Sequence, residues 1–163
     1  MPNPDATRFC ISNLISPATV QLHLTGRDRD DVLRELVALV PELADRPEAR
    51  ASLFKALIDR EQLHSTGIGD GIALPHARQA LAELVPKPVV AFGRHLGGVS
   101  YGAIDNRPVN LFFLLVTTTV TEHLQVLARI SRLVRDARLR QDLLTADRPE
   151  TVLKVIRDAE SIT

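Results

Sequence analysis

The chain has 163 residues, of which 45% are hydrophobic, and its 20 basic side chains balance its 20 acidic ones. This length and apolar content predict one folded domain with its own core and exclude a disordered chain. Because the formal net charge is zero, no basic surface is indicated, and we expect neither nucleic-acid binding nor direct membrane insertion.

The start of the chain and its cysteine content indicate a cytoplasmic protein. Residues 1–8 contain two prolines and lack the pattern of a secretory signal, so we expect a flexible tail there and a single domain over 9–163. Cys10 is the single cysteine, which excludes an internal disulfide and a cysteine-rich zinc site. The most apolar run, 109–120, is too short to cross a membrane.

Strand and helix patterns alternate along the first half of the chain. Period-two spacing of Val20, Leu22 and Leu24 predicts a strand with these side chains on one face. Asp28 or Asp30 is a suitable cap for the helix that follows. The expected elements are a short helix over 9–15, a strand over 19–24, a helix from about 29 to 40 with Val32, Leu33, Leu36, Val37 and Val40 inward, a helix from Pro47 to about Glu61 with Ala51, Phe54, Leu57 and Ile58 inward, and a strand over 72–74.

The second half combines a long apolar strand with amphipathic helices. Residues 111–116 have no polar alternation, which is typical of a strand buried on both faces. The expected elements are a helix over 77–84, strands over 88–93, 99–101 and 108–116, a helix over 121–134 with Leu124, Leu127, Ile130 and Val134 inward, and helices over 137–145 and 149–159, the last capped by Asp147. This mixture predicts an α/β domain with a mixed parallel and antiparallel sheet flanked by helices.

Residues 65–76 form the most informative motif. Gly67, Gly69 and Gly71 alternate with other residues, and the run ends in Pro75 and His76. Such glycines allow backbone conformations closed to other residues and can turn amides toward an anion. Proline fixes its own φ and so presents the following imidazole at a defined place. An anion-binding loop beside a held imidazole predicts a phosphohistidine site.

This motif resembles the active-site segment of the fructose–mannitol-type EIIA domains of the bacterial phosphotransferase system, including their nitrogen-regulatory branch. The similarity covers about residues 15–156. It rests on Arg60-Glu61, Ser65-Thr66-Gly67-Ile68-Gly69, Gly71-Ile72-Ala73, Pro75-His76, residues 103–109 and 111–116, Glu122-His123-Leu124 and Leu127-Ala128.

The resemblance implies an EIIA type-2 domain with that family's fold and no cofactor. Such a phosphotransferase component would accept phosphoryl from an HPr-type protein on His76 and pass it to an EIIB component or act as a phosphorylation-dependent regulator. His123 would lie against His76. Residues 117–121 are rich in threonine, whereas many relatives have an acidic or proline-containing loop there, which leaves the partner's identity open.

Arg60 is expected to place its guanidinium on the phosphoryl group. We expect two kinds of group to contact the phosphoryl oxygens. They are the hydroxyls of Ser65 and Thr66 and the backbone amides of Gly67, Gly69 and Gly71. Each residue also has an ordinary structural explanation. His76 could simply start a helix, and His123 could be a surface residue that caps one. Arg60 could form a surface salt bridge with Glu61 or Asp59, and Ser65 and Thr66 could stabilise a turn.

Two other functions are compatible with the sequence. One is a regulatory protein-binding module of the same fold with little phosphate flux. The other is a zinc hydrolase that uses His64, His76 and His123, but no His-Glu-x-x-His spacing supports it and we expect no metal. His23, His64 and His95 are expected to have no role in the site, with His23 facing outward and His95 in a turn.

Overall fold

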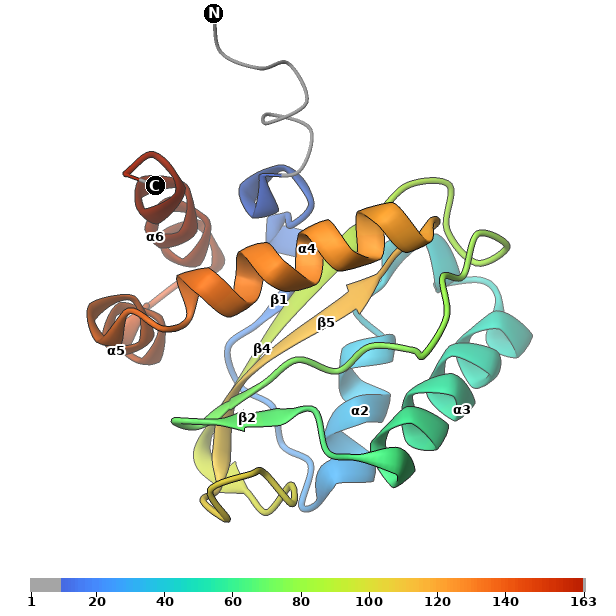
Figure 1. The fold of residues 1–163 in the computed structure, drawn as a ribbon, viewed down its shortest axis with the longest axis horizontal. Helices are drawn as coiled ribbons and strands as arrows, with labels where there is room; N and C mark the ends of the chain where they lie inside the picture. The colour runs from blue at the N-terminus through green and yellow to red at the C-terminus, as the bar shows by residue number, and fades with distance from the viewer. Residues whose placement is uncertain (1–9, 163) are drawn as a thin grey trace, which may run out of the picture.

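A five-stranded sheet forms the middle layer of the computed structural model, which describes residues 10–162 (Figure 1). Its strand order is β1-β4-β5-β3-β2. The pairs β4–β5 and β2–β3 are antiparallel, whereas β1–β4 and β3–β5 are parallel, so the predicted mixed sheet is confirmed. The strands are β1 (Val20–Gln21), β2 (Gly67–Gly69), β3 (Ile72–Ala73), β4 (Val89–Val99) and β5 (Val109–Val116).

Helices cover both faces of this sheet. In Figure 1, α4 crosses one face while α2 and α3 lie on the other. Buried side chains of α2 and α3 share one apolar core with the sheet, and those of α4, α5 and α6 share the second. The helices are α2 (Arg29–Val37), α3 (Pro47–Leu63), α4 (Val120–Leu133), α5 (Ala137–Thr145) and α6 (Pro149–Glu160), with short 3₁₀ turns η1 (Ile11–Asn13), η2 (Pro17–Thr19) and η3 (Pro41–Leu43).

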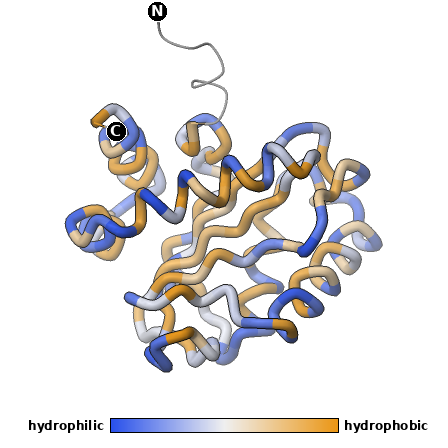
Figure 2. Tube along the Cα trace, in the orientation of Figure 1, coloured by the Kyte–Doolittle hydropathy of each residue, from blue (hydrophilic) through white to orange (hydrophobic). Residues whose placement is uncertain are grey.

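The central strands supply both cores by simple alternation. Phe112 and Leu114 of β5 face α2 and α3, whereas Phe113 and Leu115 face α4 to α6. This arrangement explains why the run lacks polar residues, since a strand in the middle layer has no solvent face. Figure 2 shows β4 and β5 as the hydrophobic centre between helices of mixed hydropathy.

Several predicted boundaries are confirmed. The carboxylate of Asp28 accepts a hydrogen bond from the amide of Asp31 at 2.9 Å and caps α2. Pro47 occupies the first turn of α3. The buried strand and the helix over 137–145 also lie where they are expected.

Other expected elements are wrong or shorter than predicted. Residues 77–84 form no helix, and the amide of Leu81 instead donates to the carbonyl of Thr117 at 2.8 Å. The strands expected over 88–93 and 99–101 are one strand, β4, so His95 lies in a strand rather than a turn. The pairing of β4 with β5 shifts register between Arg94 and Val99, which accommodates the glycines at that point.

The N-terminal elements also differ. Only Ile11–Asn13 is helical in the segment expected to be a short helix, and Phe9, like the expected tail over 1–8, lies outside the described residues. Regular pairing in the segment 19–24 is limited to β1, although the amide of Leu24 still donates to Arg94 of β4 at 2.9 Å. Leu22 and Leu24 lie in different cores, so the expected single face is wrong.

One residue of the expected inward face is exposed in each of two helices, whereas Leu57 of α3 and Ile130 of α4 are buried as expected. Ala51 is exposed, and the buried side of α3 carries Leu53, Leu57 and Glu61. Leu124 of α4 is 60% exposed. In addition, Arg148 rather than Asp147 is the N-cap of α6, and the Asp147 carboxylate accepts from the hydroxyl of Thr151 at 2.9 Å.

Buried Arg94 joins β4 to the end of α5. Its side chain is among the buried polar groups, with a residue exposure of 5%. Nη1 donates to the carbonyls of Leu143, Leu144 and Ala146 at 3.0, 3.1 and 2.7 Å. These carbonyls belong to the C-terminal end of a helix, where backbone acceptors lack helical partners.

We therefore expect Arg94→Met to lower the free energy of unfolding by about 3 kcal/mol, because buried carbonyls lose their donor. Urea denaturation measures this change. Arg140→Met is the matched control, since Arg140 donates to Val134 and Arg135 carbonyls at 2.8 and 3.0 Å at the less buried end of α4. An Arg94→Met effect no larger than that of the control would contradict the prediction.

Candidate active site

His76 lies where the chain leaves β3 and continues alongside β5. Its backbone forms a parallel bridge with Leu115, and the amide of Leu115 donates to the carbonyl of Pro75 at 3.0 Å. The residue is 8% exposed, so only a small part of the ring reaches solvent. The sheet therefore holds this histidine from its backbone, in place of the helix start that was the alternative explanation.

The orientation of the His76 ring is determined by one hydrogen bond. Nδ1 lies 2.6 Å from the carbonyl oxygen of Leu74. Because a carbonyl oxygen only accepts, Nδ1 carries the proton and Nε2 carries the free lone pair of the neutral imidazole. The nitrogen of His76 with a free lone pair is therefore Nε2.

His123 lies beside His76, as the resemblance implied. The centroids of the two rings are 5.1 Å apart and the ring planes are inclined by 55°. Nδ1 of His123 is 3.1 Å from the hydroxyl oxygen of Thr117, and the hydroxyl of Thr119 caps α4 by accepting from Glu122 at 3.1 Å. The threonine-rich segment thus positions the second imidazole at the start of α4.

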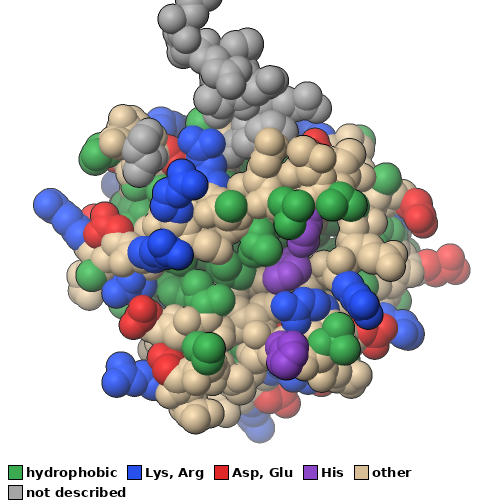
Figure 3. Space-filling model, in the orientation of Figure 1, with side chains coloured by type: hydrophobic (Ala, Val, Ile, Leu, Met, Phe, Trp, Pro, Cys, Tyr) green, Lys and Arg blue, Asp and Glu red, His purple; other side chains and the backbone are tan. Residues whose placement is uncertain are grey.

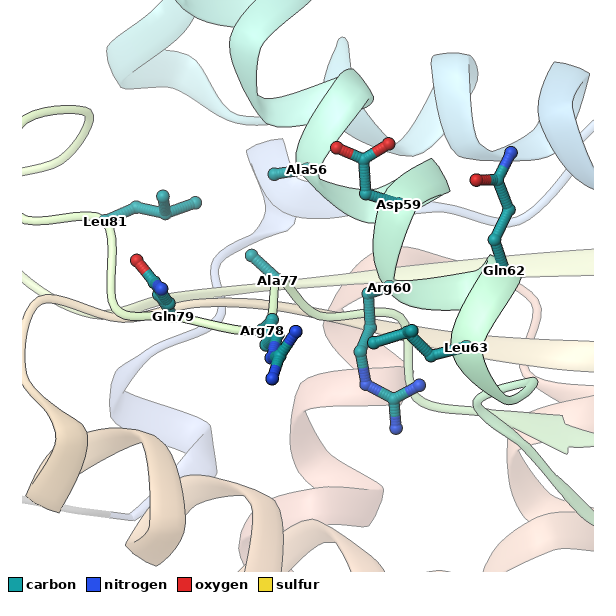
Figure 4. Close-up of a pocket in the computed structure, with 9 residues that line it drawn as sticks. All are labelled: Ala56, Asp59, Arg60, Gln62, Leu63, Ala77, Arg78, Gln79 and Leu81. Atoms are coloured by element: carbon teal, nitrogen blue, oxygen red, sulfur yellow. The ribbon is translucent and has the colours of Figure 1, made fainter.

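Arg60 approaches the histidines from the last turn of α3. Its Nη1 donates to the backbone carbonyl of His64 at 2.6 Å. Arg60 and Arg78 line a hollow of about 430 Å³, and Figure 4 shows their side chains extending in the same direction from α3 and from the segment after His76. Histidine and arginine side chains are neighbours on this face of the molecule, with apolar side chains around them (Figure 3).

The environment lowers the pKa of both imidazoles and so favours their neutral forms. Burial lowers the pKa of His76, the positive charge of Arg60 lowers it further, and the Leu74 carbonyl opposes them. Burial also lowers the pKa of His123, followed by the charges of His76 and Arg60. A neutral ring is the form that can attack a phosphoryl group.

These shifts predict a pH-dependent stability. Below pH 6.5, the ordinary pKa of histidine, an unfolded chain binds protons that the folded protein does not. The free energy of unfolding should then fall as the pH drops from 6.5 through the lowered folded pKa values. Urea denaturation from about pH 8 to about pH 5 measures this change. A His76→Gln/His123→Gln double variant should lose this part of the pH dependence, and parallel profiles for the two proteins would refute the assignment.

The glycine run forms a hairpin from β2 to β3. Its turn has positive φ at Gly69, Asp70 and Gly71, with values of 98°, 56° and 76°. The amide of Gly67 donates to the hydroxyl of Ser65 at 3.0 Å, and that of Asp70 donates to the carboxylate of Asp105 at 3.0 Å. These two amides therefore have partners inside the protein that hold the hairpin.

The hydroxyls of the motif also have partners inside the protein. The Ser65 hydroxyl donates to the carbonyl of Tyr101 at 3.3 Å, and the Thr66 hydroxyl donates to the carboxylate of Glu61. Contacts of these two residues and of the glycine amides with a phosphoryl group stay predictions.

The sequence reasoning missed two supporting residues, Glu61 and Thr117. Glu61 is 5% exposed and accepts hydrogen bonds from the Thr66 amide at 2.9 Å and the Tyr101 hydroxyl at 2.8 Å. In the sequence analysis Glu61 belongs to the segments that carry the resemblance, but the only contact considered for it is a surface salt bridge with Arg60. Its spacing of four residues from Leu57, on the buried side of α3, was the signal that could have found it.

The remaining histidines lie apart from this pair. His23 and His64 are exposed, and Nε2 of half-buried His95 is 2.9 Å from the carbonyl oxygen of Gly26. Within residues 10–162, no three histidine, cysteine, aspartate or glutamate side chains are grouped so that they could hold a metal ion.

Comparison with known proteins identifies the family. Residues 13–159 match the family described as "Phosphoenolpyruvate-dependent sugar phosphotransferase system, EIIA 2". The chain belongs to this EIIA family. Among curated EIIA relatives, the fructose-specific EIIABC component of Bacillus subtilis is 33% identical over 148 residues, which are 90% of this chain and 23% of that protein. The chain therefore spans less than a quarter of that relative.

Other relatives have a length closer to that of this EIIA chain. The nitrogen regulatory protein of Escherichia coli is 33% identical over 164 residues, covering 98% of this chain and 96% of that protein. The fructose-specific EIIA component of Haloferax volcanii is 35% identical over 117 residues, covering 71% and 74%. The EIIA family thus includes sugar-specific and regulatory relatives of this chain.

Solved structures confirm the EIIA fold. The crystal structure of the nitrogen regulatory protein IIA-Ntr of Neisseria meningitidis superposes with a TM-score of 0.80 at 28% identity, covering 90% of this chain and 98% of that one. Mannitol IIA of E. coli has a TM-score of 0.72 at 22% identity, covering 86% and 97%, and supports the fold alone. No helix in the described part of this EIIA chain has both the length and the apolar character to cross a membrane.

Proposed function

We propose that this EIIA domain is a histidine phosphocarrier that accepts a phosphoryl group on Nε2 of His76 from an HPr-type protein. The observation that carries the proposal is the 2.6 Å contact between Nδ1 of His76 and the Leu74 carbonyl, which leaves Nε2 as the free nucleophile. The proposal includes one EIIA domain over 9–163 and a cytoplasmic location, where such partners are expected.

The proposed transfer exchanges one N–P bond for another, and no proton has to leave the His76 ring. The Nε2 lone pair forms the new N–P bond while the N–P bond of the donor breaks and its electron pair returns to the donor nitrogen. Throughout the transfer, the proton stays on Nδ1, which continues to donate its hydrogen bond to the Leu74 carbonyl. His123 and Arg60 would stabilise the charge on the phosphoryl oxygens, and the acceptor's nucleophile would later displace His76 in the same way.

Exposed apolar side chains beside the histidines support protein docking. Val120 and Leu124 at the start of α4 are 66% and 60% exposed, and Leu63 at the end of α3 is 54% exposed. A small apolar centre suits a contact that must form and dissociate quickly. A protein of the same fold has been solved with a protein partner: the structure of E. coli IIA mannitol in complex with phosphorylated IIB mannitol superposes with a TM-score of 0.73 at 20% identity.

A regulatory role is the second proposal. It is favoured by the nitrogen regulatory relatives, such as the one from Bradyrhizobium diazoefficiens, which is 32% identical over 93% of this chain and 91% of its own length. In this role, phosphorylation of His76 would change which protein binds the same surface.

The test combines the protein with phosphoenolpyruvate, the first enzyme of the system and HPr. We expect one acid-labile phosphoryl group per chain, assigned to Nε2 of His76 by phosphorus NMR. Addition of EIIB components then separates the roles, because a sugar-system carrier discharges to EIIB and a regulator keeps its phosphate. Absence of phosphate uptake would leave the binding module with little flux as the better description.

A further inference from the structure

A line of hydrogen bonds runs from buried Glu61 to the ring of His76. The Glu61 carboxylate accepts from the amide of Thr66 at 2.9 Å. The carbonyl of Thr66 accepts from the amide of Leu74 at 3.0 Å, and the carbonyl of Leu74 accepts from Nδ1 of His76 at 2.6 Å. Glu61 has no role in the transfer chemistry described above.

We propose that Glu61 is a positioning residue that, through Thr66 and Leu74, holds His76 in the tautomer with a free Nε2. The inference rests on the proposed function for its effect on transfer rate. The effect of Glu61 on the tautomer of the His76 ring is independent of that function.

The short strands between Glu61 and His76 need such an anchor. β2 and β3 have three and two residues, and their pairing shifts register between Gly67 and Gly69. A hairpin of this size is only marginally stable by itself. The bond from Thr66 to Leu74 extends the pairing just beyond the hairpin, at the end nearest His76.

Glu61 is well suited to anchor that end. Its carboxylate is buried, with a residue exposure of 5%, and lies in the last turns of a 17-residue helix. Besides the Thr66 amide, it accepts from the hydroxyls of Thr66 and Tyr101. Hydrogen bonds to a charged acceptor are stronger than neutral ones, and each bond polarises the next in a chain. The Thr66 peptide is therefore fixed, and the Leu74 carbonyl is fixed with it.

The decisive variant is Glu61→Gln, which keeps the shape of the side chain and removes its charge. We expect ¹⁵N NMR of the His76 ring to change from one tautomer with an unprotonated Nε2 to a mixture of tautomers. The rate of phosphoryl uptake from HPr should fall about 10- to 100-fold, as is usual when the partner that orients an active group is lost.

A matched pair of variants separates positioning from general stability. Thr66→Val and Tyr101→Phe each remove one hydroxyl from the same carboxylate oxygen. Neither hydroxyl lies on the line to His76, which runs through the backbone amide and carbonyl of Thr66. We expect both variants to leave the tautomer unchanged, even where they lower the free energy of unfolding, because the Thr66 amide keeps its bond to the Glu61 carboxylate.

The inference is overturned if Glu61→Gln keeps a single tautomer and the wild-type rate, or if Thr66→Val or Tyr101→Phe shifts the tautomer as much as Glu61→Gln. If Glu61→Gln does not fold, Glu61→Asp, which shortens the reach of the carboxylate to the Thr66 amide, is compared with the same two controls, and a single wild-type tautomer in Glu61→Asp then overturns the inference. A wild-type protein that takes up no phosphate would overturn the proposed function instead, while the NMR comparison, made without phosphate, still tests Glu61.

Discussion

A His76→Ala variant is expected to take up no phosphoryl group from phosphorylated HPr. The variant removes the imidazole whose Nε2 is free, and the neighbouring His123 has a Thr117 hydroxyl on its Nδ1 and is not held by the sheet backbone. Mass spectrometry of the intact protein after incubation with phosphoenolpyruvate, the first enzyme and HPr measures the uptake. Wild type should gain one phosphoryl group per chain.

His64→Ala is the control for this experiment. His64 lies next to the motif but is exposed, and its contact with Arg60 uses the backbone carbonyl, which the substitution keeps. It should be phosphorylated like wild type. Stoichiometric phosphate on His76→Ala, stable enough to be mapped to another residue, would disprove the assignment of the phosphorylated histidine.

A His123→Ala variant should still be phosphorylated, but slowly. Loss of one preorganised contact to a transferring phosphoryl group costs about 2–4 kcal/mol of barrier, which is about 30- to 1,000-fold in rate. His123 is placed for that contact because its ring centroid is 5.1 Å from that of His76 and Thr117 occupies its Nδ1, which leaves Nε2 available. Arg60→Gln should act in the same direction. Rapid-quench measurement of transfer from phosphorylated HPr gives both rates.

Gln125→Ala is the matched control, since Gln125 is exposed on the same helix two residues after His123. Its transfer rate should equal that of wild type. If His123→Ala and Arg60→Gln both transfer at the wild-type rate with their folds intact, neither residue supports the reaction.

Local signals in the sequence were sufficient for much of the fold. The Asp28 cap, Pro47 in the first turn of α3 and the uninterrupted apolar run of β5 each act within a few residues. Because the physical cause is local in these cases, the sequence predicts the element without knowledge of its neighbours. The glycine run and Pro75-His76 likewise indicated where to look for a reactive histidine.

The resemblance to EIIA domains connected segments that spacing alone could not. His123 is far from His76 in the sequence, and the pattern around it would equally fit a surface helix cap. The parallel pairing of β3 with β5 places the end of one strand near the start of α4, and this pairing brings the two rings together.

Tertiary structure decided which residues are buried and how the supporting hydrogen bonds are arranged. Glu61 faces inward and Leu124 outward because of the layers that α3 and α4 contact, although their own patterns suggested otherwise. Residues 77–84 are held by a distant carbonyl, that of Thr117, rather than by helical bonds. The nitrogen of His76 that is left free is determined by the Leu74 carbonyl, and that carbonyl belongs to a residue whose amide is held by Thr66, which Glu61 holds in turn. Burial and this arrangement of bonds depend on how separate elements pack, so no local pattern could have specified them.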